Sequence, residues 1–363
     1  THYEFMLALY LEAAEDAYLS VAQVEMEKYI EAALRHTRDS LDTAKAIEIR
    51  MQAFISQNRF KDAVITGLEV LEVLGITFPK HISKYKVIFS LLKTKWAMRG
   101  KSVEELASLP EMTDPRILAA MRILIKVTRA SHYGMPKYLS LFTLKAIYLA
   151  VKYGRAPISG FNFAAFGVTM TGVLNDVEKG ARFGKLALNL LENSNQIKHR
   201  ADSMRAATLQ VVHGMIQPWT VPLKKTLDGL KQSYLYAMED GDLEFVANAA
   251  VVYTWHLFYS GNDLMLSEKE AAAFIPVIEQ AQRPSMLNAQ KLTWQCMRNL
   301  MGNSPEPAEL KGDVCTDVVI QEVESDADDE NVKFILSLNR LILLYTFGRF
   351  REDRRKALAR TKL

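Results

Sequence analysis

Small residues recur at helical spacing along this chain, and this pattern constrains the fold more than any other feature. In two stretches an apolar residue is followed at i+3, i+7 and i+10 by small or apolar residues: Phe60, Ala63, Gly67 and Val70, then Val177, Gly180, Gly184 and Ala187. These offsets place the four side chains on one face of an α-helix, where a second helix can approach closely. The pattern is typical of tetratricopeptide-type arrays, whose helix pairs repeat about every 34 residues.

Helical periodicity continues over almost the whole chain, whereas alternating strand patterns are nearly absent. Helices are predicted over residues 3–19, 22–35, 40–57, 60–75, 84–99, 103–109, 115–133, 136–154, 158–174, 177–193, 197–216, 222–240, 243–260, 268–282, 285–300 and 331–363. Three of the starts carry capping signals, namely the pairs Ser102–Glu105 and Ser267–Glu270 and the dipeptide Asp114-Pro115. The chain is therefore predicted to be all-α: a right-handed α-solenoid of antiparallel helix pairs, forming a tetratricopeptide-like superhelix.

One continuous array is the predicted domain organisation, because a solenoid grows by stacking and does not need to divide. We expect residues 1–363 to form a single helical-repeat solenoid, cut from a larger multidomain chain, since the sequence begins at Thr1 and enters a helical pattern at once. An irregular, loop-rich insertion is predicted over residues 302–330. It begins with glycines and prolines and ends in the acidic segment 321–330, which is expected to be a solvated loop or the approach to a helix.

Composition limits the class of protein and its compartment. The net charge is +3, which gives no overall attraction to a polyanion, and 49% of the residues are hydrophobic, enough for a large core. No uninterrupted apolar run approaches the ~18 residues of a membrane span. The two cysteines, Cys296 and Cys315, lack metal-ligand spacing, and free thiols in a reducing compartment are the expectation. We therefore expect a cytoplasmic protein with no membrane span.

Sequence signatures of catalysis are absent. The chain has no GxxxxGK followed by Ser or Thr, no GxGxxG, no HExxH and no GxSxG. None of its seven histidines has a second histidine or a cysteine at i+3 or i+4, the spacing that would put two metal ligands on one helix face. We therefore predict no catalytic residue, no cofactor and no metal in this segment. An enzyme built on a helical scaffold is the most distant of the alternatives.

Polar and aromatic residues on two predicted helices mark a candidate groove for a partner or ligand. They are His213 and Gln217 on the first helix, and Asn248, Trp255, His256 and Tyr259 on the second. On the inner helices of a solenoid such residues would line a concave surface. Aromatic residues at helical spacing are also typical of a core, so packing is the alternative for these positions.

Two basic segments, residues 80–101 and 349–362, are further candidate surfaces. The first carries seven Lys and Arg residues with no acid, and it suits docking on an acidic protein face, a membrane or a nucleic acid. Its cations lie on opposite sides of a helical wheel, so we expect a packed helix with solvated flanks. The second is expected to be a solvated last helix, because cations suit the C-terminal end of a helix dipole.

Five stretches of the chain resemble a known family. They are LPEMTDPRILAAMRIL (109–124), VEKGARFGKLALNLLE (177–192), DGDLEFVANAA (240–250), LFYSGNDL (257–264) and LNAQKLTWQCMRNLMGNSPEPAELKGD (287–313). The chain resembles the helical middle region of large signalling proteins. Those proteins join a serine/threonine-kinase-like domain, a signal-transduction ATPase, tetratricopeptide-like repeats, a GAF domain and a sensor histidine kinase.

The resemblance implies a position between the ATPase and the histidine kinase output, and it transfers no active-site residue. We therefore expect a non-catalytic scaffold or sensor module for protein–protein interaction and signal relay. The expected partners are the kinase and ATPase domains of the same protein or another signalling protein, with no nucleic acid. Oligomerisation stays open. The alternative is a regulatory domain that senses a small molecule or peptide in the inner groove of the solenoid.

Overall fold

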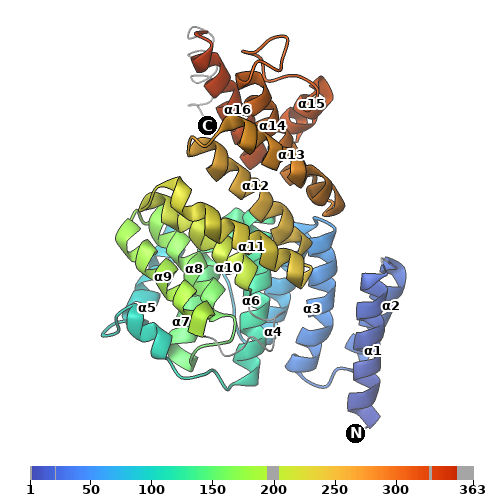
Figure 1. The fold of residues 1–363 in the computed structure, drawn as a ribbon. Helices are drawn as coiled ribbons and strands as arrows, with labels where there is room; N and C mark the ends of the chain where they lie inside the picture. The colour runs from blue at the N-terminus through green and yellow to red at the C-terminus, as the bar shows by residue number, and fades with distance from the viewer. Residues whose placement is uncertain (1, 21, 194–203, 327–328, 350–363) are drawn as a thin grey trace. The chain divides into compact units, whose positions relative to one another are not determined.

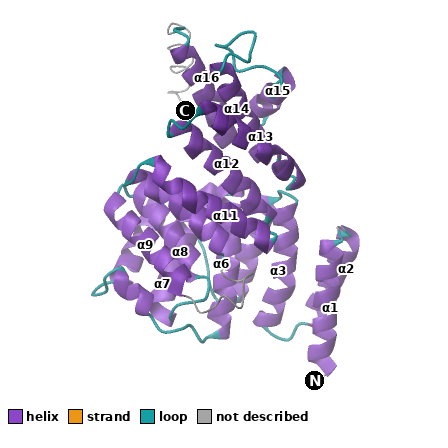
Figure 2. Ribbon diagram, in the orientation of Figure 1, coloured by secondary structure: helices purple, strands orange, loops and turns teal. Residues whose placement is uncertain are grey.

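Helices make up all the regular secondary structure that is described (Figure 2). The computed structural model describes residues 2–20, 22–193, 204–326 and 329–349. Within these ranges the only extended pairing is an isolated bridge between Glu111 and Arg155, so the predicted all-α class is confirmed. The contacts divide the chain into two compact units, Thr1–Met204 and Arg205–Leu363, each with its own core.

The first unit contains the helices coloured blue to green in Figure 1. They are α1 (His2–Leu19), α2 (Gln23–His36), α3 (Ser40–Ser56), α4 (Phe60–Val73), α5 (Lys84–Ala97), α6 (Pro115–Gly134), α7 (Leu139–Tyr153), α8 (Ser159–Val168) and α9 (Val177–Asn193). Short turns of 3-10 or π geometry lie at Glu104–Ser108, Pro136–Tyr138 and Thr169–Val173. These positions agree closely with the helices predicted from the sequence.

Neighbouring helices of the first unit pack pairwise: α1 on α2, α3 on α4, and α8 on α9. Helix α6 packs against both α3 and α4, and α7 lies against α6 and α8. Helix α5 differs from the others because its main contact is with α7. Helix α5 therefore packs on the surface of the unit and makes few contacts with the other helix pairs.

The small residues of the opening motif lie where helices nearly touch. A Cβ on Gly67 of α4 would stand 2.8 Å from Met51 Cε and would overlap Val127. A Cβ on Gly180 of α9 would stand 2.9 Å from the Gly167 carbonyl oxygen of α8. Gly184 is also buried. The predicted close-packing face is thus confirmed on both helices.

Two of the predicted capping signals are confirmed by hydrogen bonds, and one is corrected. Asp114 accepts hydrogen bonds from the backbone N–H groups of residues 116 and 117, and Ser102 and Glu105 form a reciprocal capping box. The box predicted at Ser267 is wrong. Helix α13 starts earlier because Asp263 caps it through the Leu266 N–H, and Ser267 lies buried inside the helix.

The second unit contains the helices coloured yellow to red in Figure 1. They are α10 (Arg205–Val211), α11 (Leu227–Asp240), α12 (Leu243–Tyr259), α13 (Leu264–Gln280), α14 (Pro284–Leu300), α15 (Asp317–Ser325) and α16 (Glu330–Thr346). A π-helical turn, Val212–Ile216, continues α10, and short 3-10 turns follow at Gln217–Trp219 and Leu223–Thr226. Helix α12 packs on α11, α13 and α14, and α14 also packs on α16. Part of the predicted helix 197–216 lies outside the described residues.

In the predicted insertion over residues 302–330, residues 302–316 are irregular and a helix follows. Helix α15 occupies part of the segment expected to be loop. Val323 is buried in the core, with Val319 and Ile320 packed against the same core, so the apolar residues share one helix face. Two acids are neutralised by cations, since Glu324 lies 2.7 Å from Arg340 and Asp317 pairs with Lys311. The acidic segment 321–330 is thus helical as far as Ser325, and its end is the expected approach to a helix, because Asp329 caps α16.

Candidate functional site

Helix α5 carries a row of large apolar side chains that no described element covers. Thr94 is its only buried residue, and the opposite face bears Tyr85, Ile88, Phe89, Leu92 and Trp96. This row is called the α5 ridge below. Tyr85 is 84% and Trp96 is 74% exposed. Large contiguous apolar patches on a protein surface mark sites of interaction.

The ridge follows from the order of residues on α5 and from the way the helix is anchored. The ridge positions recur at i+3, i+4, i+7 and i+11, which places them on one side of the helix. On the buried side the Thr94 hydroxyl lies 3.2 Å from the Leu144 carbonyl oxygen of α7. The segment before α5 is fixed as well, because Tyr138 Oη donates a 3.1 Å hydrogen bond to the Pro79 carbonyl.

Cations border the ridge on both sides. On a helical wheel Lys84 and Lys95 lie along one border, and Lys86 and Lys93 lie along the other. Residues 80–101 contain no acid. The sequence singled out this segment for its charge. We expected a packed helix with solvated flanks. This prediction is wrong for the outer face of α5, because the apolar residues between the cations face outward.

A cavity of about 430 Å³ lies beside the ridge, between α5, α7 and the segment before α5. It is called the lysine cavity below. Its lining includes three lysines and four aromatic rings: Lys86, Lys93, Lys145, Phe78, Tyr85, Phe89 and Tyr148. The lining contains no acidic side chain. The cavity therefore combines apolar walls with positive charge.

The positive charges in the lysine cavity are held close together by aromatic contacts. Lys93 Nζ lies 4.6 Å from the centre of the Tyr148 ring, and Lys145 Nζ lies 5.8 Å from the same ring. Partial burial lowers the pKa of Lys145, and the neighbouring Lys93 and Lys152 lower it further. An anion in the cavity would relieve this repulsion.

The six residues of the predicted groove belong to the second unit, where the structure divides them among different surroundings. His213 Nδ1 lies 2.8 Å from Gln217 Oε1, at the π-helical turn after α10. The His256 side chain is 7% exposed, and its Nδ1 lies 2.6 Å from the Thr226 hydroxyl. Burial lowers the pKa of His256 to about 4, so this ring is neutral at pH 7.

The aromatic members of the predicted groove lie against other helices. Trp255 packs on the core of the second unit, and its Nε1–H has no hydrogen-bond partner among the described residues. The Tyr259 hydroxyl donates a 3.4 Å hydrogen bond to Asn339 Oδ1 of α16, and burial raises the pKa of Tyr259. Asn248 is also buried. Trp255 and Tyr259 are partly buried, so the groove remains a prediction and packing remains its alternative.

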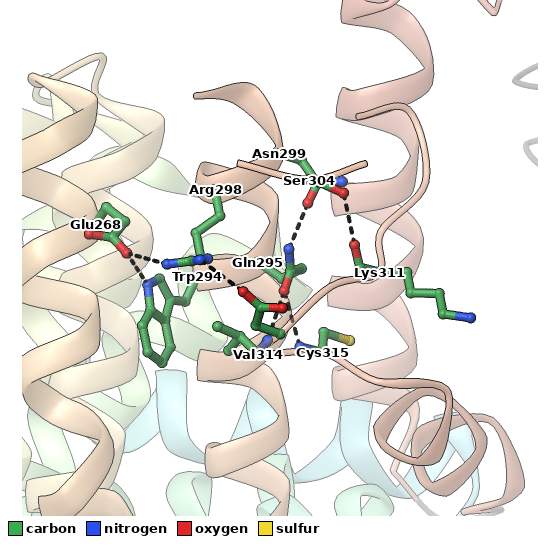
Figure 3. A network of polar contacts seen from close by, with 10 residues as sticks. Glu268, Trp294, Gln295, Arg298, Asn299, Ser304, Lys311, Val314 and Cys315 are labelled. Carbon is green, nitrogen blue, oxygen red and sulfur yellow. Dashed lines mark hydrogen bonds and ion pairs between the residues drawn. The ribbon is translucent and has the colours of Figure 1, made fainter. Parts of the chain in front are cut away.

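The loop between α14 and α15 is fixed to α14 by buried amides, a network that the sequence did not indicate (Figure 3). Gln295 Oε1 accepts hydrogen bonds of 3.0 and 3.1 Å from the backbone N–H groups of Val314 and Cys315. Asn299 Nδ2 donates to the Pro307 carbonyl at 3.1 Å. These contacts satisfy loop groups that have no partner in a helix, so the network is structural.

Neither cysteine has the surroundings of a reactive thiol. Cys296 and Cys315 are free and buried. Burial raises the pKa of Cys296 to about 12 and that of Cys315 to about 11. The described residues hold no group of three or more His, Cys, Asp or Glu side chains arranged to bind a metal ion. Among the described helices, none combines the length and the apolar character needed to cross a bilayer.

Comparison with known proteins gives one distant similarity, and no family model matches the chain. A protein named hybrid signal transduction histidine kinase G, from Dictyostelium discoideum, is 20% identical over 297 residues. The alignment covers 77% of this chain and 8% of that protein, so the chain spans a small part of its relative. The predicted resemblance is thus supported at the level of a signalling protein.

Proposed function

We propose that this chain is a non-catalytic helical-repeat module that binds protein and relays a conformational signal. In this proposal it lies in the cytoplasm, between an ATPase or kinase module and a sensor histidine kinase output. The distant similarity to a signal transduction histidine kinase supports the signalling context. The exposed α5 ridge is the observation that carries protein binding, because interface energies concentrate in residues such as Trp and Tyr.

Pairwise packing supports the repeat architecture within this proposal. Helices that are neighbours in sequence pack together, and Gly67 and Gly180 lie at close helix contacts. In the proposal these pairs are antiparallel repeats of a right-handed, tetratricopeptide-like solenoid that continues from residue 1 to 363. Such arrays transmit changes because each repeat contacts mainly its neighbours.

A small-molecule or peptide sensor is the second candidate, and one observation favours it. The lysine cavity, at about 430 Å³, falls in the range of about 300–1,000 Å³ that ligand pockets occupy. Its position on α5 and α7 differs from the inner groove expected from the sequence. A sensor that used only this cavity would leave most of the α5 ridge without a partner.

Hydrogen exchange tests the proposed function directly. The purified chain is mixed in turn with the ATPase region, the kinase-like region and the histidine kinase region of its parent protein. We expect slower amide exchange in α5 with at least one region, because a docked protein excludes water from the ridge. Unchanged exchange over the whole chain with every region would remove the proposal. A small-molecule sensor would instead show slower exchange with metabolites and none with the protein regions.

A further inference from the structure

We propose that the α5 ridge and the lysine cavity together receive an acidic amphipathic helix of a protein partner. The inference rests on the proposed protein-binding function and names the partner's chemistry. Apolar residues of the partner helix cover the ridge, and carboxylates on its flank enter the lysine cavity. Three lines of argument lead to this occupant: the shape of the ridge, the charge around it, and the hollow beside it.

The ridge has the length and spacing of a helix-packing surface. From Tyr85 to Trp96 it extends along about 16 Å of helix axis, at ~1.5 Å per residue. A partner helix of about three turns would cover it, with anchors at i, i+3, i+4 and i+7. Its outer face has no partner in the part of the chain that the structure describes, because α5 packs chiefly on α7.

The charge around the ridge selects an acidic partner. Cations border the ridge on both sides, and three acids on neighbouring elements have partners of their own. Glu104 lies 2.7 Å from Arg182, Glu105 caps Ser102, and Asp176 lies 2.7 Å from Lys179. Asp176 also interacts electrostatically with Lys95, but the lining of the lysine cavity holds no acid. Acidic side chains from outside would therefore meet lysines that have no carboxylate beside them in the cavity, and a basic partner would be repelled.

The lysine cavity favours a protein partner over a flat lipid surface. Its lysines lie in a recess beside the ridge, and Tyr85 and Phe89 belong to both. A bilayer would take up the protruding ridge but would present no side chain to fill the recess. A helix with apolar anchors and flanking Asp or Glu side chains matches both features at once.

Photo-crosslinking in cells that make the full-length protein identifies the occupant. The crosslinking residue p-benzoylphenylalanine replaces Phe89 or Trp96 in turn, and the adducts are sequenced by mass spectrometry. Exposed apolar residues on other helices, Val24 and Met265, are the matched control positions. We expect adducts at positions 89 and 96 to map to an acidic helical segment of a protein.

Charge variants then test whether the lysine cavity selects that segment. We expect Lys93→Gln with Lys145→Gln to lower the adduct yield at position 96 roughly tenfold, because the carboxylates lose their partners. Lys28→Gln with Lys185→Gln removes the same charge from exposed positions on α2 and α9 and should leave the yield unchanged. Circular dichroism and thermal melting confirm that each variant is folded.

The remaining outcomes separate this inference from the proposed function. Adducts at 89 and 96 that map to a basic or uncharged protein segment would overturn the partner's chemistry and leave protein binding intact. Protein adducts confined to the control positions would overturn the site alone. An absence of protein adducts at all four positions would count against the proposed function itself.

A vesicle experiment tests whether the ridge binds a lipid surface instead of a protein. The purified chain is sedimented with vesicles of phosphatidylcholine alone and of phosphatidylcholine with phosphatidylserine. We expect no co-sedimentation with either. Binding to the anionic vesicles that is lost in the Lys93→Gln, Lys145→Gln variant would assign the ridge to a membrane surface and overturn the inference.

Discussion

His256 shows at the scale of one residue how a side chain that suggests a ligand site can instead be part of the core. Its Nδ1 lies 2.6 Å from the Thr226 hydroxyl, which is also 2.7 Å from the Leu223 carbonyl oxygen. The hydroxyl has one proton, so when it donates to Leu223 the imidazole N–H must donate to Thr226. The histidine therefore ties α12 to the turn before α11.

The burial of His256 predicts a loss of stability in mild acid. Its pKa is about 4 in the folded chain and about 6.5 when unfolded, so the unfolded state binds the proton first as the pH falls. Stability contributed by the neutral ring is complete above pH 6.5 and is lost between pH 6.5 and pH 4, by about 3 kcal/mol in all. Urea unfolding of the wild type and of His256→Gln measures this.

We expect the variant to lose less stability than the wild type between pH 6.5 and pH 5, where few carboxylates titrate. His81→Gln, at an exposed position, is the control and should keep the wild-type slope. Parallel slopes for all three proteins would show that folding does not lower the pKa of His256.

Alanine substitutions at Gly180 and Gly172 are expected to change the stability of the chain differently. A Cβ at Gly180 would stand 2.9 Å from a backbone oxygen of α8, whereas a Cβ at Gly172 would meet open space. We expect Gly180→Ala to destabilise the chain by about 1–3 kcal/mol through overpacking. Gly172→Ala should be neutral or slightly stabilising. Thermal melting compares the two, and equal melting temperatures would mean that α8 and α9 do not pack this closely.

At the scale of elements, the amide of Gln295 is one of the contacts that hold the loop between α14 and α15 on α14. Gln295 Oε1 accepts from two backbone N–H groups, so Gln295→Ala leaves both without a partner, at a cost of about 1–3 kcal/mol each where they remain buried. We expect the loop to open and Cys315 to react faster with a thiol reagent. Cys296 of α14 is the internal standard and should stay slow.

Asn303→Ala, at an exposed position of the same loop, is the matched control for this prediction. It should leave the labelling rate of Cys315 unchanged. Equal rates for Gln295→Ala and the wild type would show that other contacts hold the loop on α14.

Substitution of Trp255 on α12 tests whether this residue contributes to packing or to binding of a partner. The ring packs on the core of the second unit, so Trp255→Ala should lower the free energy of unfolding by about 3 kcal/mol. Tyr259→Phe removes one hydroxyl and should cost about 1 kcal/mol. Unfolding in urea measures both variants. If the Trp255→Ala variant kept its stability but lost affinity for a region of the parent protein, the predicted binding groove would be supported.

The sequence predicted the helices of this chain more reliably than the surfaces that they present. Asp114 and the Ser102–Glu105 box were readable because caps act over three or four residues. The capping box predicted at Ser267 was wrong because Asp263, one turn earlier, is the residue that caps α13. Helix α15 was missed because its acids outweighed the short apolar face that ends at Val323.

The candidate sites were harder to predict because one helical wheel cannot show which face is covered. Trp255 and Tyr259 share a face that suggested a groove, yet Trp255 packs on the core of the second unit and Tyr259 bonds to Asn339 of α16. Tyr85 and Trp96 share a face that looked like a core, yet it is exposed. Tertiary neighbours decide between these cases, and their positions depend on contacts far apart in the sequence.

At the scale of the whole molecule, the positive charge of the lysine cavity should allow ATP to bind but not to be hydrolysed. The chain has no glycine-rich phosphate loop, so nothing in its sequence would orient the phosphates for transfer. The lysine cavity nevertheless presents Lys86, Lys93 and Lys145 to any anion. We expect ATP to bind weakly there at low salt, to be displaced as the ionic strength rises, and not to be hydrolysed.

Calorimetry and phosphate release measure the two properties on the same preparation. The Lys93→Gln, Lys145→Gln variant should lose the weak binding, whereas Lys28→Gln with Lys185→Gln, which removes equal charge elsewhere, should keep it. Neither variant nor the wild type should release phosphate above a blank. Turnover that survives further purification and falls in the cavity variant would contradict the non-catalytic proposal, because a contaminating ATPase would be indifferent to those two lysines.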